Sequence, residues 1–230
     1  MGANAVTTVP VYTAGEVLTA ADMNITNSGI PVFATTVTRD AAFGGAGEKT
    51  LAEGQFAYIE ASNATQYYDG AAWVAVGGGV VQVLSTAKTD TFTTTSSTFT
   101  DVTSLSVSIT PTSASNKVLV LATVAGNGQN GVASLQGQLV RNSTAIAIGD
   151  AASNRTRVSF GNIEEIVSNM TISSIMFLDS PATTSATTYK IQVRSNVSGQ
   201  TVVINRTFND TDTAQITRGI STITVMEVTA

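Results

Sequence analysis

The feature that most constrains the fold of this chain is the alternation of apolar and polar side chains in short runs after residue 80. The runs at 105–109 and 189–193 show it clearly, because every second residue is Leu, Val, Ile or Tyr. A repeat of two residues is the period of a β-strand that buries one face. Clusters of Asn, Gly, Ser and Asp separate about eight to ten such runs, a pattern typical of sandwiches and barrels. We therefore predict an all-β chain in which residues 80–230 form a jelly-roll-like β-sandwich.

Some of these runs are apolar on both faces. Residues 118–125 and 220–228 have apolar or small side chains at consecutive positions. A sandwich buries only one face of each sheet, so the surplus apolar face predicts contact with a neighbouring subunit. The C-terminal run is the predicted seam, because it is nearly free of charge, as interface cores are. The predicted interface residues are Ile220, Ile223, Val225, Met226 and Val228.

Two local details of these runs are also predicted. Glu227 interrupts the C-terminal run, and we expect it at the rim of the interface or paired with a base such as Arg218. The apolar residues Ile172, Ile175 and Phe177 change phase once, which predicts a β-bulge within that strand.

A run of three glycines at 77–79 marks the predicted boundary between two domains. The charges divide at the same point, since residues 1–79 carry seven acids and two bases and residues 80–230 carry nine of each. All of the net charge of −5 therefore lies in the first third. The Asp69-Gly70 turn between two aromatic-rich runs predicts a β-hairpin in this small, strand-rich module. We expect Trp73 to be largely buried in the module, rather than presented as a platform for sugars.

The composition excludes several classes of chemistry. The chain contains no His and no Cys, which rules out Ser-His-Asp and Cys-His catalysis, zinc sites with nitrogen or sulfur ligands, haem, iron–sulfur clusters and disulfides. Acids outnumber bases by 16 to 11, which disfavours a nucleic-acid binder. No apolar run approaches the ~20 residues of a membrane-spanning helix. We expect no enzyme activity, no cofactor, no metal and no membrane insertion.

Carboxylates leave two alternatives open. Glu164 with Glu165, and Asp210 with Asp212, are the tight carboxylate clusters after residue 80. A glycosidase needs two carboxylates that flank a sugar, so a carboxylate-based carbohydrate-active enzyme is a remote alternative. Asp210 and Asp212 could supply oxygens to a cation, although the calcium-loop pattern is absent and solvated turn residues are the simpler interpretation.

Several segments of the chain resemble those of known proteins. In the first third they are residues 11–24, the Arg39-Asp40 pair and the run Tyr-Asp-Gly-Ala-Ala-Trp-Val at 68–74. In the remainder they are residues 91–103, 105–111, 116–120 and 221–228. Together these segments resemble minor tail and fibre-like virion proteins of tailed bacteriophages, and the resemblance covers most of the chain.

The resemblance implies a non-enzymatic structural protein of the virion, a short tail fibre or tail-attached adhesin. Residues 1–79 would form an attachment module that docks on other virion proteins, and residues 80–230 an exposed head domain that contacts a glycan or protein of the host surface. It also implies a homotrimer, made in the host cytoplasm and carried on the extracellular particle. A capsid decoration or head-fibre protein of the same architecture is the alternative. The resemblance assigns no receptor-binding residue.

Overall fold

The computed structural model of the chain describes residues 15, 17, 29–44, 49–77, 79–129, 131–162 and 168–229. The chain divides into two compact units, Met1–Gly78 and Gly79–Ala230, which we call the small unit and the head. The division falls within the glycine run at 77–79. Across the described ranges, no helix is both long enough and apolar enough to cross a membrane.

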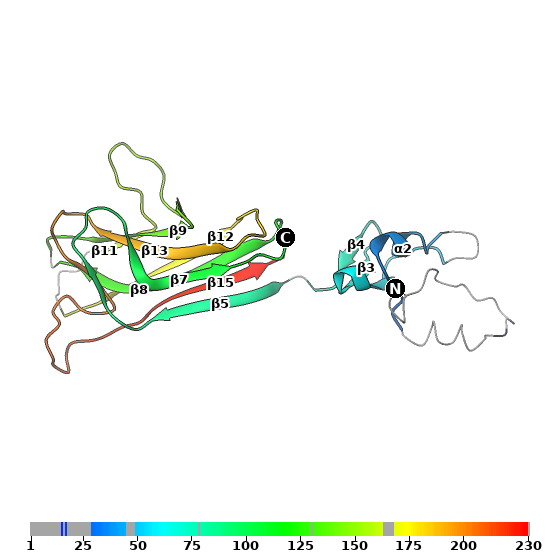
Figure 1. Ribbon diagram of the computed structural model, residues 1–230, viewed down its shortest axis with the longest axis horizontal. Coiled ribbons are helices and arrows are strands. Elements are labelled where there is room, and N and C mark those ends of the chain that lie inside the picture. Colours follow the sequence, from blue (N-terminus) through cyan, green and yellow to red (C-terminus); the bar gives the residue numbers. More distant parts are fainter. Residues whose placement is uncertain are drawn as a thin grey trace. The chain divides into compact units, whose positions relative to one another are not determined.

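In its described residues, the small unit is a four-stranded sheet with one short helix (Figure 1). The strands lie in the order β1-β2-β3-β4, with β1 parallel to β2 and the other pairs antiparallel. A single 3-10 turn, η1, follows β2. The elements are β1 (Val32–Phe33), α2 (Thr36–Asp40), β2 (Phe56–Ile59), η1 (Glu60–Ser62), β3 (Ala64–Tyr68) and β4 (Trp73–Ala75).

Local sequence accounts for two boundaries in the small unit. Helix α2 begins at a capping box, in which the side chains of Thr35 and Thr38 each bond to the backbone of the other residue. The β3–β4 hairpin turns at Asp69-Gly70, where Gly70 has a φ of +97° that favours glycine. Backbone N–H groups at 72 and 71 donate to Asp69 Oδ1 at 2.7 and 2.9 Å and lower the pKa of Asp69.

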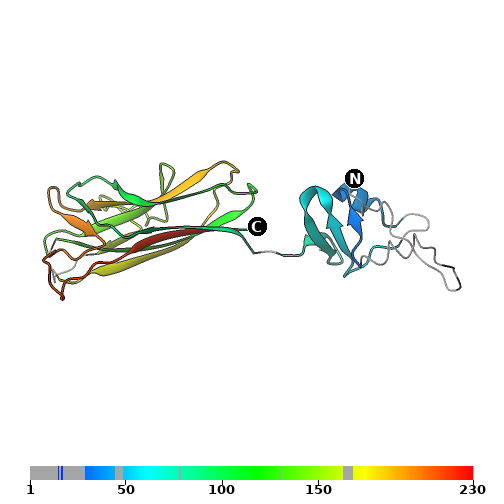
Figure 2. The same ribbon diagram turned by 60° about the horizontal axis from the view of Figure 1, so that its bottom comes forward.

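The head consists of two sheets. The larger sheet contains β5 (Val80–Lys88), β15 (Ser221–Val228), β8 (Lys117–Gly128) and β12 (Thr171–Asp179), each paired with the next. The short β14 (Val202–Ile204) also pairs with β8, and β6 (Phe92–Thr94) pairs with β14. The smaller sheet contains β7 (Thr100–Ile109), β13 (Thr187–Ser195) and β9 (Leu135–Arg141), with β10 (Thr144–Ile146) and β11 (Phe160–Asn162) beside β9. In Figure 2 the sheets form two layers, with the red strand β15 in the lower one.

The pairing of strands in the head is that of a rolled-up hairpin. The first strand, β5, pairs with the last, β15, and the following strands pair inward in the same way: β6 with β14, β7 with β13, β8 with β12, and β9 with β11. All these pairs are antiparallel. This nesting is the topology of a jelly roll. The predicted all-β fold class is confirmed.

The core of the head lies between the two sheets and draws on the inward residues of both. Its fully buried members include Leu105, Val120, Leu139, Ile191, Ile223 and Val225. The bulge predicted in β12 is wrong, because β12 pairs with β8 in unbroken register from Thr171 to Asp179. Ile175 and Phe177 point into the core, while Ile172 points outward and is 63% exposed. The apolar residues of β12 therefore occupy both faces of a regular strand.

Candidate functional site

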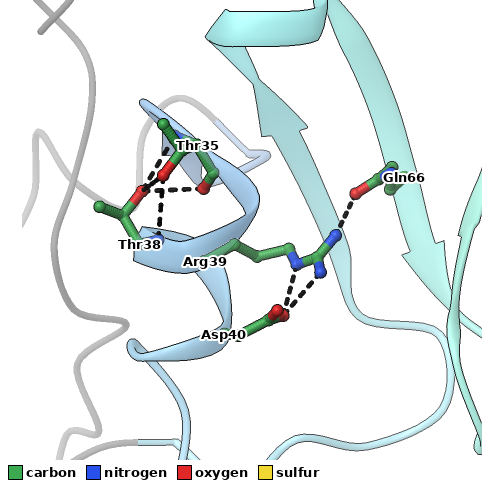
Figure 3. Close-up of polar contacts among 5 residues, drawn as sticks. All are labelled: Thr35, Thr38, Arg39, Asp40 and Gln66. Carbon is green, nitrogen blue, oxygen red and sulfur yellow. Dashed lines mark hydrogen bonds and ion pairs between the residues drawn. The ribbon is translucent and has the colours of Figure 1, made fainter.

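Arg39 is a buried base at the centre of a polar cluster in the small unit (Figure 3). It lies in α2 and is 6% exposed. Its Nε and Nη2 donate to Asp40 Oδ1 at 2.8 and 2.6 Å, and its Nη1 donates to Gln66 Oε1 on β3. The guanidinium carbon lies 4.6 Å from the centre of the Trp73 ring on β4. Because a cation is attracted to an aromatic face, Arg39 joins the helix to two strands of the sheet.

Trp73 is half-buried against this cluster. Its ring centre lies 5.7 Å from that of Phe43 and 5.8 Å from that of Tyr68, and Arg39 covers one of its faces. The ring also packs on the core of the small unit, which comprises Phe33, Ala42, Ala57 and Ile59. We expected Trp73 to be largely buried, and the structure leaves part of it exposed. Since Arg39 already occupies one ring face, that face is not free to stack on a sugar.

Glu227 is a fully buried carboxylate in the head. Its Oε1 accepts hydrogen bonds from Thr112 N and Oγ1 and from Asn116 Nδ2, at 2.6–2.8 Å, and its Oε2 accepts from Gln82 Nε2 at 2.6 Å. Burial opposes ionisation, but these bonds outweigh it and lower the pKa of Glu227 to about 2. The expected position at a rim or beside Arg218 is wrong, because Glu227 ties β15 to β5 and to the connection between β7 and β8.

A second buried group joins the two sheets of the head. Arg141 Nη1 on β9 donates to both oxygens of Asp179 on β12 at 2.9 Å, and Tyr189 Oη on β13 donates to Asp179 Oδ2 at 2.6 Å. Burial, together with the bond to Asp179, raises the pKa of Tyr189 above its usual range. Removing one member of a buried charge pair leaves the other uncompensated, so these three residues stabilise the sandwich as a unit.

The structure divides the five predicted interface residues between the core and the surface. Ile223 and Val225 point inward from β15 and are fully buried in the core of their own subunit. They cannot contact a neighbouring subunit, which corrects the prediction for these two residues. Met226 and Val228 point outward and are half-buried, and Ile220, just before β15, is 51% exposed. These three remain at the surface.

Of the two carboxylates that suggested a cation, Asp210 is already paired with bases. Asp210 Oδ1 lies 2.7 Å from Arg218 Nη2, and Asp210 Oδ2 lies 3.9 Å from Arg206 Nη1. Asp212 is exposed. In the part of the chain that the structure describes, no three acidic side chains gather as ligands for a metal ion would. Glu164 and Glu165 lie outside the described residues.

The outward face of the smaller sheet carries a row of polar groups. Asp101 on β7 accepts hydrogen bonds from Lys190 Nζ at 2.8 Å and from Gln192 Nε2 at 2.7 Å, both on β13. Gln138 Nε2 on β9 donates to Gln192 Oε1 at 2.8 Å, so the row crosses three strands. The bond from Lys190 is the main cause that lowers the pKa of Asp101. Groups of this kind suit either solvent or a ligand rich in hydroxyls.

Comparison with known proteins identifies no family. No protein-family model matches the chain, and no curated protein matches it significantly. Among solved structures, the structure of infectious bursal disease virus Gx strain is similar at 10% identity and a TM-score of 0.26. That likeness covers 72% of this chain and 43% of the other, so this chain spans less than half the length of that one. A likeness at this level gives no guide to function.

Several residues of these clusters were not singled out by the sequence. Gln82 and Gln138 lie within strands β5 and β9, and Asn116 lies in a polar turn. The partners of all three are far along the chain. For Glu227 the sequence does give an indication, because it is an acid within an apolar run. A carboxylate that is buried there needs hydrogen-bond donors nearby. The sequence could not indicate which donors those are.

Proposed function

We propose that the chain is a non-enzymatic structural protein of a tailed-bacteriophage particle, a short tail fibre or tail-attached adhesin. In this proposal residues 1–79 dock on other virion proteins and the head contacts a glycan or protein of the host surface. We propose further that it acts as a homotrimer on the extracellular particle. A capsid decoration or head-fibre protein is the alternative position for the same architecture.

The observation that carries the proposal is the division into two compact units at a run of glycines. Glycine leaves the backbone free to adopt many conformations, so a unit that is held on a particle can carry a second unit that reaches outward. The charge follows the same division, because residues 1–79 are acidic and residues 80–230 are neutral. Different surfaces for docking and for exposure are what an attached fibre needs.

The use of acidic side chains in the head supports a non-enzymatic role. Glu227 and Asp179 are buried and accept several hydrogen bonds each, and Asp210 lies between two arginines. A catalytic acid and base must reach a substrate, and a carboxyl group that acts as the catalytic acid tends to have a raised pKa. Glu227 has the opposite property, a lowered pKa in a closed site.

Labelling of particles tests the proposed position. In electron micrographs, gold-labelled antibodies raised against the full chain should bind at the tail of particles purified from a lysate of the producing host. Label confined to the capsid would replace the tail assignment by the capsid alternative. Purified particles that lack the chain by mass spectrometry would overturn the virion role. Added full chain should also compete with particles for adsorption, and failure to compete would remove the adhesin function.

Incubation with host surface polysaccharide tests the non-enzymatic part. We expect no new reducing ends above a buffer control. New reducing ends that disappear on substitution of one Asp or Glu would overturn this part and favour the carbohydrate-active alternative.

A further inference from the structure

The outward side of the larger sheet carries a contiguous apolar surface. We define the apolar face as six residues on four adjacent strands: Val83 of β5, Met226 of β15, Leu119 and Leu121 of β8, and Leu178 and Met176 of β12. They are direct cross-strand neighbours, because Met226 pairs with Val83 and with Leu119, Leu119 with Leu178, and Leu121 with Met176. Met176 is 77% exposed, Val83 52% and Leu178 48%, so a large part of this surface faces solvent in the single chain.

The other sheet of the same head provides an internal comparison. An antiparallel sheet that packs one face on a core normally carries polar residues on the other face. The smaller sheet follows this rule with Asp101, Gln138, Lys190 and Gln192. The larger sheet does not, and the largest apolar patch on a protein surface is often a functional one.

Four hydroxyl groups beside the apolar face are bonded to one another in pairs. Ser85 Oγ lies 2.8 Å from Thr224 Oγ1, and Thr123 Oγ1 lies 3.4 Å from Thr222 Oγ1. These hydroxyls fill the outward positions of β5, β15 and β8 next to the six apolar residues. Because they already pair, a covering surface would not leave them without hydrogen-bond partners, and the cost of burying them is small.

The size of this side of the sheet is sufficient for a stable contact. At ~4.8 Å between strands and ~3.3 Å per residue, four strands over about nine residues cover roughly 500 Å². The largest apolar patch of an ordinary monomer is about 300–600 Å². One partner contributes about 800 Å² to an interface of standard size. The apolar face with its hydroxyl surroundings would therefore supply most of what one subunit needs.

The chemistry of the face favours a second copy of this chain over a different partner. A transient partner is recognised by charges and hydrogen bonds, whereas permanent contacts between identical subunits are more apolar. None of the six residues is charged, and the acid of β15, Glu227, points into the head. Residues 80–230 also carry nine acids and nine bases, so two heads meet without net repulsion.

We infer that the apolar face is the surface on which copies of this chain pack together. The inference rests on the proposed self-association and is independent of the virion role. It moves the predicted seam from both sides of β15 to one side of the whole larger sheet, with Met226 retained and Ile223 and Val225 assigned to the core. The polar row of the smaller sheet then remains on the outside of the assembly.

A charge placed on the apolar face tests the inference in the full chain. Met176→Lys should dissociate the assembly, because an unpaired charge would be buried on association, and it should leave the fold intact, since Met176 is exposed in the single chain. The matched control is Ser106→Lys, which puts the same charge on the outward face of β7. We expect light scattering to give three times 23.6 kDa for the unmodified chain and for the control, and 23.6 kDa for Met176→Lys. The dissociation constant should rise by on the order of 100-fold or more.

Cysteine cross-linking provides a second measurement that does not depend on dissociation. The chain has no Cys, so Leu121→Cys introduces a single thiol near the middle of the face. A short bismaleimide should link copies of Leu121→Cys, and it should not link copies of Ser106→Cys. A dimer that Met176→Lys dissociates would support the face and contradict the trimer. A monomeric chain, or an assembly that keeps its mass in Met176→Lys, would overturn the inference, whatever the position of the chain on a particle.

Discussion

Substitution of Glu227 by Gln tests how much the buried carboxylate and its four hydrogen bonds stabilise the head. The side chain keeps its shape but loses its charge, and one of its acceptor oxygens becomes a donor that faces the donor Gln82 Nε2. Hydrogen bonds to charged groups contribute about 1.5–3 kcal/mol each. The bonds to Oε1 persist in weaker form, so we expect Glu227→Gln to lower the free energy of unfolding of the head by about 2–4 kcal/mol.

Thermal unfolding followed by far-ultraviolet circular dichroism measures this loss. For 150–250 residues, 1 kcal/mol corresponds to about 2–4 °C, so the Tm should fall by roughly 5–15 °C at pH 7. The matched control is Asp150→Asn, which removes a charge from an exposed position of the head and should change stability by less than ~0.5 kcal/mol. The signal must come from the strands, because the one Trp, Trp73, lies in the small unit.

A second test compares how the stabilities of the unmodified chain and of Glu227→Gln depend on pH. The pKa of Glu227 is lowered from 4.5 to about 2 on folding, so between these values the unfolded chain binds the proton more readily. The stability due to the carboxylate is therefore complete above about pH 4.5 and is lost as the pH falls toward 2. The difference in stability between the unmodified chain and Glu227→Gln should shrink over that range. Equal Tm values at pH 7, or a difference that does not change with pH, would refute this account of Glu227.

Three further predictions concern the backbone, the small unit and the boundary. A Cβ at Gly128 would lie 1.9 Å from a backbone carbonyl oxygen, so Gly128→Ala should cost the head about 2–3 kcal/mol in chemical unfolding, whereas Gly149→Ala, with open space around it, should be nearly neutral. Arg39→Lys keeps the charge but loses the planar contact, and it should destabilise the small unit by about 1–2 kcal/mol, read from the fluorescence of Trp73. Limited proteolysis should cut first near the glycine run at 77–79 and release a stable head, and first cuts inside the sandwich would contradict the division.

Much of the fold follows from local sequence. The period of two at 105–109 and 189–193 predicts strands with one buried face, and both runs lie in the smaller sheet with that face in the core. The Asp69-Gly70 pair predicts a hairpin because only a few residues tolerate a positive φ, and Gly70 adopts one. Signals of this kind involve residues that are close along the chain, so sequence alone can reveal them.

Tertiary structure alone decides which face of a strand turns inward when both faces are apolar. In β15 the sequence marks Ile223, Val225 and Met226 equally, and the pairing of β15 with β5 and β8 buries the first two and leaves the third half-buried on the outward face. In β12 the same ambiguity suggested a bulge that the regular pairing with β8 removes. The partners of Glu227 come from positions 82, 112 and 116, more than a hundred residues away. Periodicity specifies that a strand has two faces, but the rolling of the whole chain decides what each face meets.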